Sequence, residues 1–270
     1  MIRCVISTNK RTYKSCLLRT YHEGPYLYAQ VSLDMNHKTD NPLGDKVENT
    51  SPAPWPSKNI SLVGKYVTIQ GLSSNHAIDL FPLIGGENNA HLWDYMPYSP
   101  CPPNEATLTS ELEQKAASSD PVYYTISKHT KDGNKGPVGM ASYLRIDAKN
   151  RVIEVGHLMF SSQLQRSAAS TEAMYLMMRY AFEELGYRRY EWKCHSLNAP
   201  SNRAALRLGF TFEGTFRRHL IDKHGCNRDT NWYSIIEEEW PNRKKAFEAW
   251  LDGNNFDEHG QQEKRLEDFR

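Results

Sequence analysis

The fold of this chain is decided by residues 152–186, which read VIEVGHLMFSSQLQRSAASTEAMYLMMRYAFEELG. The first nine residues are rich in β-branched and large apolar side chains, which predicts a strand over 152–160. Ser170 or Thr171 can cap a helix over 170–185, and Gly186 can end it. The apolar face of this helix is formed by Met174, Met177, Met178, Ala181 and Leu185. The start of such a helix presents backbone N–H groups and a positive dipole end to an anion.

Strands and turns surround this stretch. Residues 122–128 and 138–146 read as strands separated by a turn, and together with the strand over 152–160 they predict an antiparallel meander. The same reasoning predicts further strands over 62–69, 189–194, 215–221 and 230–237. Helices are expected over 73–83, 104–118, 170–185 and 198–208, and a last one from Pro241. This order predicts one mixed α/β domain over residues 59–252.

The two ends of the chain differ from this domain in composition. Residues 1–22 are basic and contain no acidic residue, which fits a dispensable tail, a transit peptide, or a start of translation at Met35. Residues 36–58 are polar and end in a proline-rich run, as a linker does. We therefore expect 1–58 to be a disordered tail and linker, and 253–270 to be a charged C-terminal tail that is frayed.

Composition excludes several classes of protein. Lysine and arginine number 33 and aspartate and glutamate 32, so a net charge of +1 argues against a nucleic-acid binder that relies on bulk charge. No apolar run is long enough to cross a membrane. The five cysteines are scattered and form no CxxC pair, which argues against a disulfide scaffold and a zinc cluster. We expect a soluble cytoplasmic protein, or a mitochondrial one if the N-terminus is a true transit peptide.

Two motifs resemble those of the GCN5-related N-acetyltransferases, the GNAT superfamily. The run QRSAASTEA over 165–173 is similar to the family's acyl-CoA loop, written Q/R-x-x-G-x-G/A. Asn198-Ala199-Pro200-Ser201 followed by LGF over 208–210 and EGTFR over 213–217 resembles the stretch N-x-x-S … L-G-F-x-x-E-G-x-x-R. This second motif is the more specific, and it is typical of the branch that contains the ribosomal-protein N-terminal acetyltransferases.

The resemblance covers about residues 60–251 and implies the GNAT fold, a central and mostly antiparallel mixed sheet of about seven strands flanked by four or more helices. It implies acetyl-CoA as the co-substrate and no metal. The loop departs from the family pattern at two positions. Ala168 stands where the family has glycine, and Ser170 stands where it has glycine or alanine. Glycine allows close approach of the backbone to a phosphate, so this departure bears on affinity.

The resemblance also implies positions for the donor. The pantetheine arm would run beside strand residues Leu158, Met159 and Phe160, at a splay from the neighbouring strand. The pyrophosphate would lie on the loop formed by Gln165, Arg166, Ser167, Ala168, Ala169, Ser170 and Thr171. Asn198 and Ser201 would contact the donor, with Ser201 able to protonate the leaving thiolate and Asn198 able to hold the arm. Each of these positions also has a structural explanation, as sheet core or as a helix cap.

A base is needed because an amine must be neutral to attack. Glu154 is one candidate, on the strand face shared with Gly156 and Leu158, although an ion pair with Arg145 or Arg151 would explain it equally. His157 should then point to the opposite face and be packed. Trp93 and Tyr95 lie where the family lines its acceptor pocket. Glu213 is a further substrate-binding candidate and the alternative base to Glu154, although a structural pair with Arg217 would explain it as well.

The sequence thus predicts an N-acyltransferase that moves an acetyl group from acetyl-CoA to a primary amine by direct attack in a ternary complex. The acceptor would be a small-molecule amine or a protein N-terminus, with no nucleic acid and no membrane as partner. The alternative is a non-catalytic acyl-CoA binder or interaction module with a degenerate site, which the replaced glycines motivate. The sequence leaves the oligomeric state open.

Overall fold

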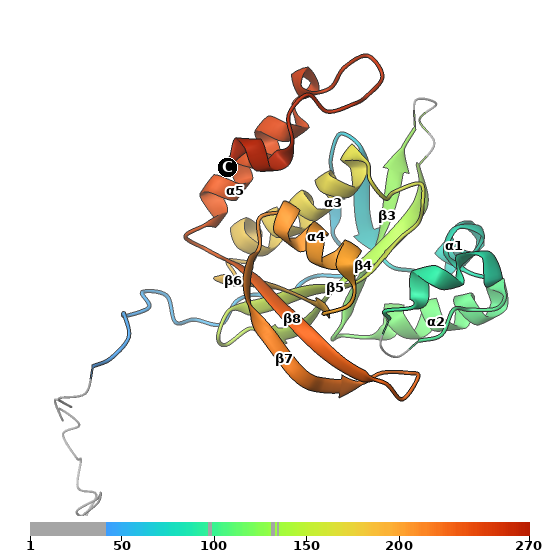
Figure 1. Cartoon of the computed structure of the whole chain (residues 1–270), viewed down its shortest axis with the longest axis horizontal. Helices are drawn as coiled ribbons and strands as arrows, with labels where there is room; N and C mark the ends of the chain where they lie inside the picture. Colours follow the sequence, from blue (N-terminus) through green and yellow to red (C-terminus); the bar gives the residue numbers. More distant parts are fainter. Residues whose placement is uncertain (1–41, 97–98, 131–132, 134) are drawn as a thin grey trace, which may run out of the picture. The chain divides into compact units, whose positions relative to one another are not determined.

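A computed structural model describes residues 42–270, except 97, 98, 131, 132 and 134. One compact unit spans Glu48–Arg270. Its centre is an eight-stranded sheet of order β1-β2-β3-β4-β5-β6-β8-β7, in which β5 and β6 pair in parallel and every other pair is antiparallel. Figure 1 shows this sheet and the helices around it. The expected fold class, a mostly antiparallel mixed sheet flanked by helices, is confirmed.

The strands are β1 Ser61–Val63, β2 Val67–Gly71, β3 Val122–His129, β4 Lys135–Asp147, β5 Val152–Phe160, β6 Arg189–His195, β7 Thr211–Ile221 and β8 Asn227–Ile236. The helices are α1 Ala77–Ile84, α2 Glu105–Ala117, α3 Ala168–Arg179, α4 Ala199–Arg207 and α5 Trp240–Leu251. Short 3-10 turns cover Ser74–His76, Glu87–Trp93, Gly253–Asn255 and Leu266–Phe269, and a π-helical turn, Tyr180–Glu184, continues α3.

Alternation along the strands gives the sheet two apolar faces, each covered by its own helices. Tyr124 and Ile126 point to the larger core, which includes α3, α4 and α5, whereas the intervening Tyr123 points to a smaller core with α1 and α2. Figure 1 shows the two helix groups on opposite sides. Because α3 lies between the sheet and α5, all residues from Thr171 to Met178 are buried, the polar Thr171 and Glu172 included.

The first strand differs from the expectation of one strand over 62–69. The structure divides it into β1 and β2 around Gly64 and Lys65, which brings the sheet to eight strands rather than about seven. The cause is Glu172 of α3, whose carboxylate accepts the backbone N–H groups of Lys65, Tyr66 and Val67 at 2.6–2.9 Å. A Cβ at Gly64 would collide with that carboxylate, so any larger residue there would displace it from the three N–H groups that it binds.

The last residues of the stretch expected to be a linker lie against the domain. Ala53 is buried and donates its N–H to Ala148 O at 2.9 Å, and the Trp55 indole donates to Ser119 O at 3.1 Å. Tyr124 donates its hydroxyl to Ser57 O at 2.9 Å. Residues 53–57 therefore belong to the packed unit, while residues 1–41 lie outside the described part of the chain, so the expectations for the tail remain predictions.

The C-terminal segment also packs instead of extending away. Leu266 is 1% exposed within the larger core, and Phe256 contacts the Trp250 ring edge-on. Arg270 donates to the carbonyls of Leu206 and Arg207 at the end of α4. Residues 253–270 thus cover α5 and α4 rather than fraying. No helix in the described part of the chain is both long enough and apolar enough to cross a bilayer.

Candidate active site

The parallel pair at the centre of the sheet separates half-way along its length. β5 and β6 pair only from Val152 to Val155 and from Arg189 to Trp192. Beyond this point β5 carries one extra residue against β4, since Met140 faces Met159 while Ser142 faces Gly156. His157, within this β-bulge, has a φ of 48°. The expected splay beside Leu158–Phe160 is therefore present, and it opens on the side of β6.

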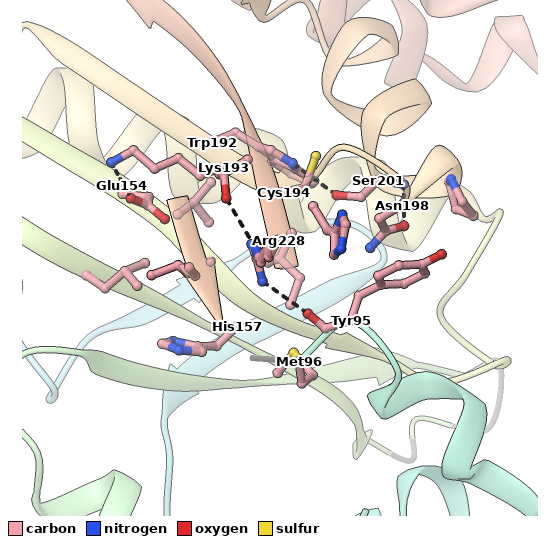
Figure 2. Close-up of a pocket in the computed structure, with 18 of the residues that line it drawn as sticks. Tyr95, Met96, Glu154, His157, Trp192, Lys193, Cys194, Asn198, Ser201 and Arg228 are labelled. Atoms are coloured by element: carbon pink, nitrogen blue, oxygen red, sulfur yellow. Dashed lines mark hydrogen bonds and ion pairs between the residues drawn. The ribbon is translucent and has the colours of Figure 1, made fainter. Parts of the chain in front are cut away.

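A cavity of about 400 Å³ lies at this separation. Its walls come from β5 and β6, from the start of α4, from β7 and β8, and from the segment around Tyr95 and Met96. Figure 2 shows Ser201 and Asn198 at one end of the cavity and Glu154 at the other, with Arg228 between them. Segments far apart in the sequence thus converge where the sheet has a gap, which is the position of a ligand site rather than of a packed core.

The start of α4 combines a helix cap with a side chain in the cavity. Asn198, not Ser201, is the N-cap, because its Oδ1 accepts the Ser201 N–H at 3.1 Å. Ser201 Oγ accepts the Trp192 indole N–H at 3.1 Å, which leaves the hydroxyl proton for another acceptor. Both residues line the cavity. Asn198 therefore caps α4 and lines the cavity at the same time.

Asn202 fixes this corner, and sequence reasoning did not find it. Its Nδ2 donates to the carbonyls of His195, Ser196 and Asn198. Its Oδ1 accepts from Cys194 Sγ at 3.2 Å, from Asn231 Nδ2 at 2.8 Å and from Tyr233 Oη at 2.6 Å. One amide thus connects the loop before α4 to β6 and β8, and it holds Asn198 and Ser201 against the cavity.

Glu154 is buried at the far end of the cavity between two cations. Its carboxylate oxygens accept from Arg145 Nη1 and from Lys193 Nζ, each at 2.7 Å. Lys193 is held in addition by Glu191 at 2.7 Å and by the Trp232 ring at 3.8 Å. Burial raises the pKa of the Glu154 carboxyl, and Lys193 and Arg145 oppose that rise. The alternative pairing with Arg145 is present, whereas Arg151 donates to Ser51 O instead.

His157 lies in the cavity wall beside Leu158, not on the opposite face. This corrects the expectation from strict alternation, because the bulge changes which side chains face the gap. Ser142 Oγ donates its single proton to Gly156 O at 3.1 Å, so it accepts the His157 Nδ1–H at 2.9 Å. The other ring nitrogen, Nε2, then carries a lone pair. Burial lowers the pKa of His157 to about 4, so the ring is neutral at pH 7.

The loop before α3 is organised by its own side chains. Ser167, rather than Ser170 or Thr171, is the N-cap: its Oγ accepts the Ser170 N–H at 3.2 Å, and Ser170 Oγ bonds back to Ser167. Among the described residues this leaves the N–H groups of Ala168 and Ala169 without an acceptor. Of this loop, Gln165 lines the cavity.

Of the three predicted acceptor residues, the structure places Tyr95 in the cavity wall and Trp93 and Glu213 outside it. Tyr95 lines the cavity, donates its hydroxyl to Leu197 O at 3.1 Å, and meets the His195 ring edge-on at 5.6 Å. Trp93 is 1% exposed in the smaller core, with its indole N–H donated to Ile84 O. Glu213 forms a two-pronged ion pair with Arg189, not with Arg217, and it lies outside the cavity wall.

Other wall residues were absent from the prediction. Lys193, His195, His219 and Arg228 line the cavity together with Trp192 and Cys194. Strand alternation places Lys193 on the same face of β6 as Glu191, so the sequence alone could have predicted the ion pair between these two side chains. Met159 is buried in the smaller core, and Phe160 lies outside the wall, so of the three strand residues Leu158 reaches the cavity with its side chain.

The sequence of this domain matches a known family. Residues 67–211, more than half of the chain, match the family model of the acetyltransferase (GNAT) domain. The chain belongs to the GNAT acetyltransferase family. A GCN5-related N-acetyltransferase from Brucella melitensis has a similar structure, with a TM-score of 0.78 and 39% identity over 83% of this chain and 99% of that chain. The GNAT family predicted from the two motifs is thereby confirmed.

Two curated GNAT relatives match over a shorter span. The ribosomal-protein-serine acetyltransferase of Escherichia coli is 32% identical over 101 residues, 37% of this chain and 54% of that protein. The N-acetyltransferase YoaA of Bacillus subtilis is 30% identical over 100 residues, 37% of this chain and 55% of that protein. The match thus spans about half the length of these relatives. It supports the predicted ribosomal-protein N-acetyltransferase-like branch.

The GNAT fold is also shared with the microcin C7 self-immunity acetyltransferase MccE, solved in complex with acetyl-CoA and AMP. That structure has a TM-score of 0.55 and 24% identity, and the match covers 67% of this chain and 98% of MccE. At this identity the likeness concerns the fold alone.

Proposed function

We propose that this GNAT protein transfers an acetyl group from acetyl-CoA to a primary amine, by direct attack within a ternary complex. The observation that carries the proposal is the cavity itself, which opens where β5 and β6 separate and which Ser201, Leu158 and Gln165 all line. The fold relative MccE was solved with acetyl-CoA, which supports this donor. The relative YoaA is named as an N-acetyltransferase, which supports acyl transfer to nitrogen.

In the proposed complex the pyrophosphate of the donor binds at the start of α3. The N–H groups of Ala168 and Ala169 and the charge of Arg166 supply attraction, and the dipole of α3 adds to it. The pantetheine arm runs along the backbone of Leu158, Met159 and Phe160, where β5 has left β6. Asn198 holds the arm at the opposite wall.

The chemistry that we propose forms the N–C bond and breaks the C–S bond. The neutral amine attacks the thioester carbon, and a backbone N–H near Leu158 or Met159 stabilises the oxyanion. The amine proton passes to Glu154, the predicted base, or to His157, whose Nε2 lone pair is set by Ser142. The leaving thiolate takes a proton from the Ser201 hydroxyl, and the proton released by the amine returns to Ser201 through solvent, so CoA departs as the thiol and the enzyme regains its starting state.

A second candidate function is a non-catalytic acyl-CoA-binding module. The observation that favours it is the start of α3, where the Ser170 hydroxyl is engaged with Ser167 and Ala168 adds a methyl group. Such a module would bind CoA and release no thiol. The cavity that Ser201 lines argues for transfer, because a protein that only binds CoA needs no room for an acceptor beside the thioester.

The experiment is a release assay for CoA thiol with acetyl-CoA and a panel of amines, peptides and aminoglycosides, with the acetylated product identified by mass. Transfer to at least one amine, reduced about 10²-fold or more in Ser201→Ala, is the expected result. CoA binding without any product would favour the binding module. A folded sample that shows no binding at millimolar CoA would overturn both functions.

A further inference from the structure

His157 presents a basic ring nitrogen at the wall of the cavity. Its Nδ1–H is donated to Ser142 Oγ at 2.9 Å, which leaves the lone pair on Nε2. Among the residues that the structure describes, none hydrogen-bonds to Nε2, although the residue lines the cavity. A lone pair in this position can accept a proton from a molecule that binds in the cavity.

The sheet holds the ring in this orientation. His157 has a φ of 48°, in the left-handed region, within the bulge of β5 against β4. Bulges of this kind re-aim side chains and are over-represented next to active sites. Tyr123 of β3 packs against the ring, with the two ring centroids 5.3 Å apart. Contacts from β3 and β4 and the bend of β5 therefore fix the direction of the imidazole.

Ser142 of β4 decides which ring nitrogen carries the proton. Its hydroxyl proton is donated to Gly156 O at 3.1 Å, so toward His157 the oxygen acts as an acceptor. In a neutral histidine the partner of one ring nitrogen sets the protonation of the other. Ser142 is 0% exposed, so water does not compete for this bond. The buried serine thus selects the tautomer in which Nε2 is the acceptor.

Glu154, the other candidate for the amine proton, is engaged differently. Its two oxygens accept from Arg145 and from Lys193, each at 2.7 Å, and its side chain is 4% exposed. Proton uptake by this carboxylate would remove the negative charge that both cations face, which weakens it as a proton acceptor. We therefore assign Glu154 to the buried ion-pair cluster.

The charge state of His157 fits repeated proton uptake. Burial lowers its pKa to about 4, and the charges of Arg145 and Lys115 act in the same direction. The ring is therefore unprotonated before each reaction, and it gives up an accepted proton readily afterwards. A weak base suffices because the amine nitrogen becomes far more acidic as it bonds to the thioester carbon.

We propose that His157 is the catalytic residue that takes the amine proton and that Ser142 positions it. The inference rests on the proposed function and decides between its two proton acceptors. The nitrogen lone pair forms the N–C bond while its proton passes to Nε2, and the C–S bond breaks as the thiolate takes the Ser201 proton. The imidazolium then releases its proton to solvent, from which Ser201 regains one. Figure 2 shows His157 and Ser201 apart from each other, on β5 and α4.

The kinetic test uses His157→Asn, which tolerates the positive φ and can still donate to Ser142 but has no Nε2. We expect kcat to fall about 10²-fold or more, with the affinity for CoA within about 2-fold of the parent protein. The matched control is His129→Asn, because His129 is half-buried and bonded to the Thr68 hydroxyl but lies outside the cavity wall. A parental kcat in His157→Asn would overturn the inference.

Chemical rescue tests the lone pair rather than the volume of the ring. His157→Gly also tolerates the positive φ, and it serves if the asparagine variant does not fold. Added imidazole should raise its kcat about 10-fold or more, whereas pyrrole, a ring of the same size without a basic nitrogen, should not. Equal rescue by both rings would show that His157 only fills space, and would overturn its role as proton acceptor.

The tautomer is measured without turnover, by NMR of the full chain labelled with ¹⁵N at histidine. At pH 7 the His157 signals, assigned by their loss in His157→Asn, should show a proton on Nδ1 and none on Nε2. Ser142→Ala should shift the proton to Nε2 and lower kcat about 10-fold or more, and Ser142→Thr, which keeps the hydroxyl, should retain the parental tautomer.

The outcomes separate this inference from the proposed function. A proton on Nε2 of His157 in the parent protein would overturn the inference, whatever the CoA release assay shows. An unchanged tautomer and kcat in Ser142→Ala would overturn the role of Ser142. Absence of acetyl transfer by the parent protein would overturn the proposed function and the proton transfer with it, whereas the tautomer result stands by itself.

Discussion

At the scale of single residues, the site depends on side chains that have two roles. Asn198 caps α4 and lines the cavity, and Ser201 accepts the Trp192 indole N–H while it faces the same cavity. Loss of either side chain removes a hydrogen bond that stabilises the fold together with the proposed role in the reaction. Rates and stability therefore have to be measured on the same variants.

Ser201→Ala should lower kcat about 10²-fold or more, because the leaving thiolate loses its proton donor. The affinity for CoA should change little, and stability should fall by about 1 kcal/mol through the lost acceptor for the Trp192 indole. Steady-state kinetics, CoA titration and thermal melting measure the three effects. Ser196→Ala, a neighbouring serine outside the cavity wall, is the control. A lowered melting temperature with unchanged kcat would show that Ser201 is structural only.

His157 should make stability depend on pH. Burial lowers its pKa to about 4, so between pH 6.5 and pH 4 the unfolded chain binds a proton that the folded chain does not. The free energy of unfolding therefore falls as pH falls through this window. The raised pKa of Glu154 acts in the opposite sense, since the folded chain then holds the extra proton.

His157→Asn should flatten this fall, because asparagine tolerates the positive φ and its amide can still donate to Ser142. Thermal melts of the variant and the parent protein at several values between pH 7 and pH 4.5 test the prediction. His259→Asn, which removes an exposed histidine, is the control. Identical slopes for parent and His157→Asn would contradict the cause that we assign.

At the scale of elements, the site depends on how strands and helix ends meet. The bulge in β5 brings His157 and Leu158 into one wall, and the separation of β5 from β6 opens the backbone toward the donor. Asn202 then ties α4 to β6 and β8 through six hydrogen bonds. Helix ends and one strand gap therefore define the site, not a single loop.

The start of α3 gives a prediction at this scale. Arg166→Glu should reduce the stabilisation that CoA produces, because a negative charge beside the Ala168 and Ala169 amides repels the pyrophosphate. At about 100 times the dissociation constant, CoA should stabilise the parent protein by ~2.7 kcal/mol. Thermal shifts with CoA and with pantetheine measure the effect. Because pantetheine carries no pyrophosphate, the Arg166→Glu substitution should leave its thermal shift unchanged. Equal losses with both ligands would argue against a pyrophosphate site at α3.

At the scale of the whole molecule, segments from both ends of the chain complete the domain. Residues 53–57 hydrogen-bond to β3 and to the segments that follow α2 and β4, and residues 253–270 cover α4 and α5. The predicted domain of 59–252 is therefore shorter than the compact unit that starts at Glu48.

Removal of residues 1–47 should leave the melting temperature unchanged, whereas removal of 1–58 should lower it. The longer deletion takes away the contacts of Ala53, Trp55 and Ser57, which include three hydrogen bonds of about 1 kcal/mol each. A shift of about 2–4 °C per kcal/mol is expected for a domain of this size. Equal melting temperatures for the two truncations would show that residues 48–58 contribute nothing to stability.

The sequence alone determined the strand, loop and helix over 152–186, the second motif around Asn198 and Ser201, and with them the family. Those features are local, since caps, periodicity and turn residues act within a few positions of one another. The tertiary structure decided that Lys193 holds Glu154, that Trp93 is core and Tyr95 is wall, and that Arg228 enters the cavity. These contacts depend on strand order, on register and on one bulge, which together bring distant segments to the same gap in the sheet and which no local pattern specifies.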